Sequence, residues 1–146
     1  MSIERNDLTR MIQMALNEVR IVPSTEGECA YATNAPEVEL TENYTEVCTT
    51  LMTIPQRQRV CHIAFTAVVS TDENAMFDNT ISAVITLNGQ QQSKVYQVAG
   101  NTINFIDFME FEIGTYQVSV QMKIQQESAG QRYFLKPRSC KLGVYL

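Results

Sequence analysis

The chain has 146 residues, the length of one domain, and 45% of them are hydrophobic, enough for a sizeable core. The net charge is −5, whereas nucleic-acid binders carry a basic footprint, so we expect no nucleic-acid partner. No apolar run approaches the roughly 20 residues of a membrane helix, so we expect no membrane partner. Glu4, Asp7 and Glu18 interrupt the apolar positions of the first twenty residues. We therefore expect no signal peptide and synthesis in a cytoplasm.

Residues 1–20 are predicted to form an amphipathic helix, followed by a β domain over residues 21–146. Apolar residues recur there at three- and four-residue spacing, which is the period of a helix with one apolar side. This stripe could pack against the chain's own sheet, or against a second copy or another protein. The positions that we take as a candidate assembly surface are Leu8, Met11, Ile12, Ala15 and Val19.

The next stretch, residues 26–46, is acidic and contains no Lys or Arg. Short strands are expected at residues 29–33 and 38–40. A basic cluster lies near the other end of the chain, at Arg132, Lys136, Arg138 and Lys141. These opposite charges are either solvated faces or a matched pair, within one chain or between neighbouring chains.

Residues 46–54 are rich in threonine and β-branched side chains and predict a strand. Residues 59–70 predict the most apolar strand. One face of that strand carries Cys61, Ile63, Phe65, Ala67 and Val69. The opposite face is only half polar and carries Val60, His62, Ala64, Thr66 and Val68. A strand with two apolar faces is either central in the fold or meets another chain with its outer face.

Strict alternation continues along the second half of the chain. Residues 80–88 predict a strand, Asn88-Gly89 a hairpin turn, and residues 93–99 the return strand. After a turn and residues 102–108, the pattern runs on through 109–124, with Gly114 as a kink or bulge inside it. The side chains expected to face inward are Tyr116, Val118, Val120, Met122 and Ile124, with Ile81, Ala83, Ile85 and Leu87.

The last part of the chain contains three further predicted features. Residues 128–130 are expected to close a hairpin that leads into a strand at 133–135, and a final strand runs over 139–146. Short strands with turns at about 10-residue spacing are typical of sandwiches and barrels. We therefore predict a mostly β chain: an antiparallel β-sandwich of jelly-roll type with eight to ten strands and one N-terminal α-helix.

No arrangement of residues predicts catalysis. The histidine His62 lies mid-strand, which favours a structural role or a subunit contact over a catalytic base. Asp72, Asn74 and Asp78 share a loop but lack the glycine and terminal glutamate of a calcium loop. Glu110 and Glu112 lack the aromatic cleft of a glycosidase. We expect no enzyme activity, no cofactor and no metal.

The cysteines Cys29, Cys48, Cys61 and Cys140 are widely spaced and contain no C-x-x-C pair, which argues against a zinc site. Two disulfides could join them in three ways. A chain of this length does not need disulfides, so we expect mostly buried, unpaired thiols.

The stretch F-E-I-G-T-Y-Q-V-S-V-Q-M that ends at Met122, with the final strand S-C-K-L-G-V-Y-L, resembles a known family. This pattern is similar to the trimeric jelly-roll heads of the tumour-necrosis-factor and complement-globular-head type. Bacteriophages use similar small β-sandwiches as capsid decorations and fibre tips. The resemblance covers about residues 60–146 and implies a homotrimer whose chain ends on a core strand.

Together these features favour a non-enzymatic virion structural protein: a phage capsid decoration, a head or tail fibre, or a tail-associated component. We expect it to act in the virion by oligomerising, with itself and other virion proteins as partners. The alternative is a soluble ligand-binding module of the carbohydrate-binding type. The absence of tryptophan counts against that alternative, because sugar faces stack on aromatic rings.

Overall fold

The computed structural model describes residues 28–55, 57, 59–72, 76–128 and 130–145. Within these residues the regular structure consists of strands, and no α-helix is present. The strands are β2 (Glu28–Thr33), β3 (Val38–Glu39), β4 (Thr45–Ile54), β5 (Arg59–Val68), β6 (Ser70–Thr71), β7 (Ile81–Leu87), β8 (Gln90–Val98), β9 (Thr102–Phe111), β10 (Gly114–Ile124), β11 (Tyr133–Leu135) and β12 (Cys140–Tyr145). No helix in this part of the chain is long and apolar enough to cross a membrane.

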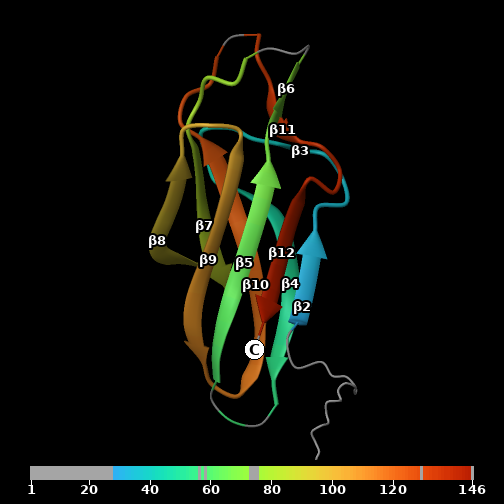
Figure 1. Cartoon of the computed structure of the whole chain (residues 1–146), viewed down its shortest axis with the longest axis vertical. Coiled ribbons are helices and arrows are strands. Elements are labelled where there is room, and N and C mark those ends of the chain that lie inside the picture. Colours follow the sequence, from blue (N-terminus) through green and yellow to red (C-terminus); the bar gives the residue numbers. More distant parts are fainter. Residues whose placement is uncertain (1–27, 56, 58, 73–75, 129, 146) are drawn as a thin grey trace, which may run out of the picture.

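Two four-stranded antiparallel sheets pack face to face, as Figure 1 shows. One sheet has the order β2-β12-β5-β9 and the other has the order β4-β10-β7-β8. A small sheet of order β3-β11-β6 lies at one end of the molecule. The predicted class, a mostly β chain forming an antiparallel sandwich, is therefore confirmed.

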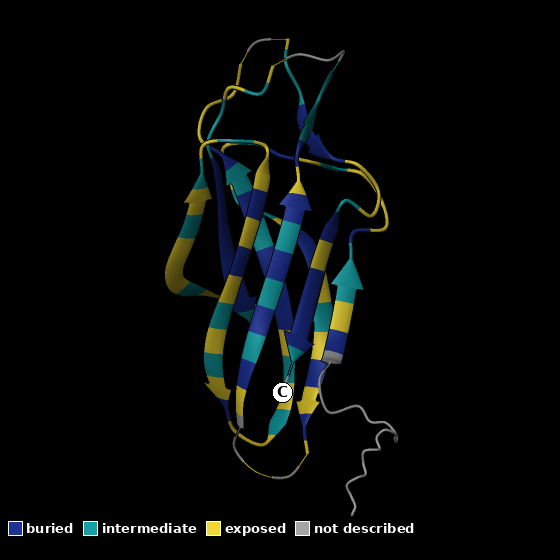
Figure 2. Cartoon of the chain, in the orientation of Figure 1, coloured by how far each residue is buried: buried dark blue, intermediate teal, exposed yellow. Residues whose placement is uncertain are grey.

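Alternation of apolar and polar residues builds the core between the two sheets. On β10, Val118, Val120 and Met122 are fully buried, and Tyr116 packs against the core. The predicted inward positions of β7 are also confirmed, with Ile81, Ala83 and Ile85 buried and Leu87 at the core margin. Figure 2 shows the same alternation as bands along the strands.

Strand β5 also has the two faces that the sequence predicts. Its inward side chains are buried: Cys61, Ile63, Phe65 and Ala67, followed by Val69 just beyond the strand. Its other face points away from the core, where Val60 and Val68 are exposed. The strand is interior in its sheet, between β12 and β9, and its outer face meets no other element of the described chain.

The prediction of one continuous element over 109–124 is wrong. The chain leaves the sheet of β9 after Phe111 and enters the other sheet at Gly114, so β9 and β10 belong to different sheets. Gly114 has φ +152°, and the preceding Ile113 is 64% exposed. Period-two alternation is the same in both sheets, so the pattern passes through the crossover unchanged.

The turn predicted at Asn88-Gly89 is confirmed, whereas the hairpin predicted at 128–130 is wrong. Asn88 and Gly89 have φ values of +52° and +84°, which suit the primed turn that joins β7 to β8. After 128–130 the chain does not pair back onto β10. Instead β11 lies between β3 and β6, and residues such as Leu135 close that end of the core.

The acidic and basic segments meet within one chain. Arg132 contacts Glu37, lies 3.7 Å from Glu39 Oε1 and 3.3 Å from Asp72 Oδ1. These acidic partners, with the Glu37 hydrogen bond first, raise the pKa of Arg132. The predicted helix over residues 1–20, with its assembly positions, lies outside the described residues.

Candidate functional site

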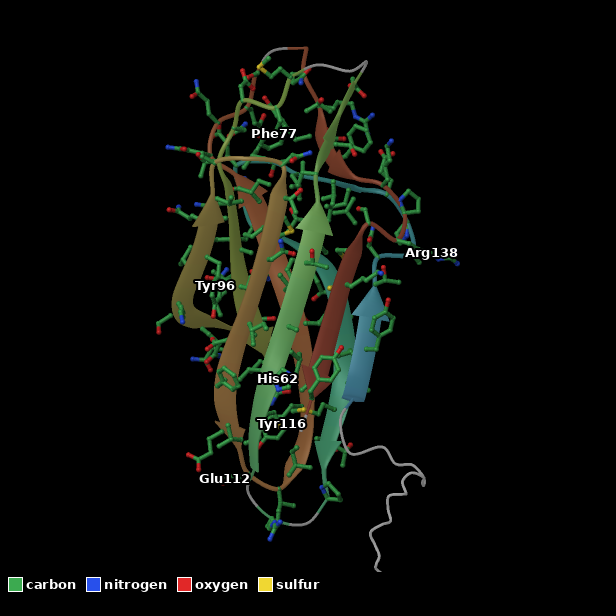
Figure 3. All side chains as sticks on the ribbon, in the orientation of Figure 1. His62, Phe77, Tyr96, Glu112, Tyr116 and Arg138 are labelled. Carbon is green, nitrogen blue, oxygen red and sulfur yellow. The ribbon has the colours of Figure 1, made fainter. Side chains whose placement is uncertain are left out.

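The outer face of the β2-β12-β5-β9 sheet, called the hollow face below, is ordered by strand register into rows that cross the strands. In the first row Tyr145 of β12, His62 of β5 and Phe108 of β9 are neighbours. The Tyr145 and His62 rings stack at 4.9 Å with an angle of 15°, and the His62 and Phe108 centroids are 5.8 Å apart. This aromatic row belongs to the front sheet of Figure 3, where His62 is marked.

The second row has the smallest side chains of the face at its centre. Register places Tyr31 of β2 beside Gly143, Gly143 beside Ala64, and Ala64 beside Ile106 of β9. Gly143 and Ala64 leave a low floor between the larger side chains at the two ends of the row. The floor is therefore a depression, and the aromatic row forms its border on one side.

The third row is polar and borders the floor on its other side. Register places Lys141 of β12 beside Thr66 of β5, and Thr66 beside Asn104 of β9. The hydroxyl of Thr66 donates a hydrogen bond to the side-chain oxygen of Asn104. The Asn104 amide nitrogen and the Lys141 ammonium are donors at the edge of the floor.

Tyr145 of the first row and the residues of the second and third rows line an open hollow of about 640 Å³. Its lining includes Tyr31, Ala64, Asn104, Gly143 and Tyr145. Small-molecule sites typically measure about 300–1,000 Å³ and combine apolar walls with a few convergent polar groups. The hollow has that size and that composition.

Gly143 determines how Tyr145 lies in the hollow. A Cβ atom placed on Gly143 would be 2.5 Å from the Tyr145 hydroxyl and 2.6 Å from its Cε2, so the phenol ring extends over the glycine. With this orientation the ring lies against His62 and brings its hydroxyl to the floor. Any larger residue at position 143 would force the ring to move.

The hollow face is also unusually apolar for an exposed sheet face. Phe108 is 69% exposed, Val60 and Ile106 are each 59% exposed, and Tyr31 is 50% exposed. Contiguous exposed apolar side chains, rimmed by polar ones, mark binding surfaces in many proteins. The outer face predicted from the alternation in residues 59–70 is thus part of the most site-like surface of the described chain.

Glu110 of β9 pairs in register with Val60 and so lies on the hollow face, whereas the structure separates the other candidates from it. Asp72 pairs with Arg132, and Asp78 accepts a hydrogen bond from the Tyr133 hydroxyl at 3.0 Å. Glu112 lies beyond the end of β9, so it is not part of the strand pairing that includes Glu110. Among the described residues no three His, Cys, Asp or Glu side chains form a group that could hold a metal ion.

A second, polar hollow of about 410 Å³ lies near Asn79 and Gln126. The Asn79 side chain holds this loop: its oxygen accepts from the backbone nitrogens of Thr80, Gln125 and Gln126. Its amide donates to the Gln126 carbonyl at 2.6 Å. These bonds account for the asparagine as a loop-fixing residue.

Sequence reasoning missed most residues of the hollow, namely Tyr31, Asn104, Ile106, Gly143 and Tyr145. It found the β5 members of this face, His62, Ala64 and Thr66, as the half-polar face of a strand, and it found Lys141 as part of a basic cluster. A signal for the others existed in the alternation of 139–146, where the outward positions are Lys141, Gly143 and Tyr145.

Comparisons with known proteins give the following. No family model matches the chain, and no curated protein matches it. A family 35 carbohydrate-binding module from Clostridium thermocellum is 11% identical, with TM-score 0.40, over 78% of this chain and 95% of that one. A CBM35 module from Paenibacillus barcinonensis is 10% identical, with TM-score 0.39, over 80% and 98%. An exo-β-1,3-galactanase from Phanerochaete chrysosporium is 12% identical, with TM-score 0.36, over 85% and 30%. Similarities this low do not establish a shared function.

Proposed function

We propose that this chain is a carbohydrate-binding β-sandwich whose ligand lies in the hollow of the β2-β12-β5-β9 sheet. The observation that carries the proposal is the arrangement of three rows: aromatic rings on one side, a floor of Gly143 and Ala64, and donors and acceptors on the other side. This is the function class expected at the outset as the alternative to a virion protein.

The chemistry of a sugar matches these rows. A pyranose ring presents aliphatic C–H groups on its faces and hydroxyls around its rim. The C–H groups pack against Tyr145, Phe108 and Ile106, where contact removes apolar surface from water. The hydroxyls then meet the Asn104 amide and the Lys141 ammonium, which supply donors and an acceptor.

The orientation of the rows also constrains the ligand. They run across four strands, which lie about 4.8 Å apart, so the face is longer than one sugar ring in that direction. We therefore expect an oligosaccharide to lie across the strands and a monosaccharide to bind more weakly.

A panel of immobilised neutral and acidic oligosaccharides tests this proposal on the full chain. The first variant, Ala64→Leu, fills the floor of the hollow without removing a hydrogen bond. The second, Asn104→Ala, removes an amide from the polar row. The matched control is Gln117→Ala, an exposed change on the other sheet.

We expect the unchanged chain and Gln117→Ala to bind the same oligosaccharides, and Ala64→Leu to lose at least tenfold in affinity. Asn104→Ala should lose severalfold, because one neutral hydrogen bond contributes about 1 kcal/mol. Circular dichroism shows whether each variant folds. Binding by none of the panel, or equal binding by Ala64→Leu, contradicts the proposal.

The strand order supports the finer fold prediction of a jelly roll. The chain alternates between the sheets except at the β7–β8 hairpin, with β2, β5, β9 and β12 in one sheet and β4, β7, β8 and β10 in the other. The first and last of these strands are neighbours, β2 beside β12. Two interleaved four-stranded sheets with this connectivity make a double Greek key.

The proposal includes a non-catalytic role. Binding needs only the rows described, whereas hydrolysis of a glycoside needs a pair of carboxylates flanking the bond. The hollow is lined by aromatic, small, amide, hydroxyl and ammonium side chains. An assay for release of reducing ends from bound oligosaccharides should therefore give no signal above a heat-denatured control.

A second candidate function is assembly, as in a virion structural protein that forms homotrimers or docks to a larger shell. The observation that favours it is the exposure of Val60, Ile106 and Phe108, since such a patch also suits a protein partner. Size-exclusion chromatography with light scattering separates the candidates. A monomer that binds a glycan favours the first, and an obligate oligomer without a small ligand favours the second.

The N-terminal residues provide a further test of the assembly candidate. Deleting residues 1–20 should leave a folded sandwich that no longer assembles, if the predicted positions from Leu8 to Val19 provide the attachment. Unchanged assembly of the truncated chain would contradict that role.

A further inference from the structure

We propose that Cys48 and Cys140 form a disulfide that joins the two sheets when the chain meets a disulfide oxidant such as oxidised glutathione. The two residues lie in different sheets, Cys48 on β4 and Cys140 at the start of β12. Both are thiols here, and both are buried.

The fold brings the two cysteines together although they are distant in sequence. The Cys140 sulfur lies 4.0 Å from the carbonyl oxygen of Val47, the residue before Cys48, and that pair is 93 positions apart. Strands β4 and β12 approach until some of their Cα atoms are within 8 Å. A disulfide needs Cα atoms roughly 4.4–6.8 Å apart, so it can form only between residues whose strands approach closely.

The two thiols also affect each other's pKa. Interaction with the Cys48 thiol lowers the pKa of Cys140. Interaction with Cys140, together with burial, raises the pKa of Cys48. The thiolate is the form that attacks a disulfide, so Cys140 is the expected first nucleophile of the pair.

The reaction is a pair of thiol–disulfide exchanges. The Cys140 thiolate attacks one sulfur of oxidised glutathione, forming a mixed disulfide and releasing one glutathione thiolate. The Cys48 sulfur then loses its proton and attacks the Cys140 sulfur, which releases the second glutathione. The two protein thiols together lose two electrons and two protons. Glutathione disulfide gains these electrons and protons and becomes two glutathione thiols. Because both sulfurs are buried, exchange requires a local opening that lets glutathione reach Cys140 while it still lies beside Cys48.

The position of this disulfide would connect it to the hollow face. Cys140 is followed directly by Lys141 and, three positions later, by Gly143 on the same strand. A covalent bond from β12 to β4 would therefore hold the strand that forms the floor of the hollow. The bond would also close a long loop, and longer loops reduce the conformational entropy of the unfolded chain more than short ones do. Disulfide formation does not depend on the proposed carbohydrate function.

The test refolds the full chain in glutathione buffers that range from fully reduced to fully oxidised. Samples are acid-quenched, alkylated and mapped by mass spectrometry, with unfolding followed in denaturant. A Cys29→Ala/Cys61→Ala chain retains only the proposed pair and must still form the cross-link. Cys48→Ala and Cys140→Ala are matched controls that each remove one partner.

We expect an intramolecular Cys48–Cys140 peptide pair in oxidised buffer and a higher denaturant midpoint, both reversed by dithiothreitol. Neither single variant should show the dithiothreitol-sensitive rise in midpoint. The proposal is wrong if both thiols remain open to alkylation after oxidative refolding. It is equally wrong if the cross-linked chain unfolds at a lower denaturant concentration than the reduced chain, or if these two cysteines pair with others instead.

Discussion

The two outward faces of this sandwich have opposite constructions. The outer face of the β4-β10-β7-β8 sheet, called the polar face below, is a network of side-chain hydrogen bonds. Ser119 donates to Thr49 at 2.7 Å, and Gln97 donates to Ser82 at 3.1 Å. On the hollow face the central residues are Gly143 and Ala64, and the large side chains around them are apolar and exposed.

Coverage explains the difference. On the polar face Ser82, Thr86 and Ser119 are each only 2% exposed, although they point away from the core. Long glutamine side chains lie over these short ones, as in the bond from Gln91 to Gln121 at 2.8 Å. On the polar face these short side chains bond to their neighbours, whereas the hollow face keeps a floor that a ligand can reach.

The largest expected effect comes from the core that both faces share. Val120→Ala removes two carbons from a fully buried site on β10 and should lower the free energy of unfolding by roughly 2 kcal/mol. Ser119→Ala next to it loses the bond with Thr49 and should cost about 1 kcal/mol. Urea denaturation measures both. A larger loss for Ser119→Ala would mean that the polar face, and not the core, dominates stability.

The next effect compares the same added side chain on both faces. Ser82→Leu inserts a large residue beneath Gln97 on the covered face, and such overpacking should cost about 1–3 kcal/mol. Ala64→Leu projects into the open hollow and should change stability by no more than about 0.5 kcal/mol. Equal losses in urea denaturation would show that the hollow is filled and the contrast between the faces is false.

A smaller effect is expected at Gly143. The added methyl of Gly143→Ala must displace the Tyr145 ring, which loses its stacking on His62, an interaction of about 0.5–1.5 kcal/mol. Denaturation should show a loss of that order, with a change in the NMR shifts of the His62 ring protons. In a Tyr145→Ala background the same substitution should cost almost nothing. A loss of stability that persists in the Tyr145→Ala background would mean that the backbone, and not the Tyr145 ring, requires glycine at position 143.

The sequence predicts each face strand by strand but not the site that strands build together. In β5, alternation alone identified Cys61 and Ile63 as core and His62 and Ala64 as the outer face, because these positions depend only on period two. The hollow also needs β12 and β9 on either side of β5, and such pairings between distant segments are not encoded in local pattern. The crossover between Phe111 and Gly114 was missed for the same reason.

The smallest effect on stability distinguishes the faces by their surface behaviour. Ile106→Ser on the hollow face and Gln91→Ala on the polar face both change exposed side chains, so each should alter the free energy of unfolding by less than about 0.5 kcal/mol. Ile106 is 59% exposed at one end of the floor row, so its replacement shrinks an apolar patch. Retention on a hydrophobic-interaction column should fall for Ile106→Ser and stay constant for Gln91→Ala. Unchanged retention for both would mean that the hollow face is already covered, by a second copy or by residues outside those described. Light scattering on the same samples then distinguishes a second copy from residues of the same chain, because only a second copy changes the measured mass.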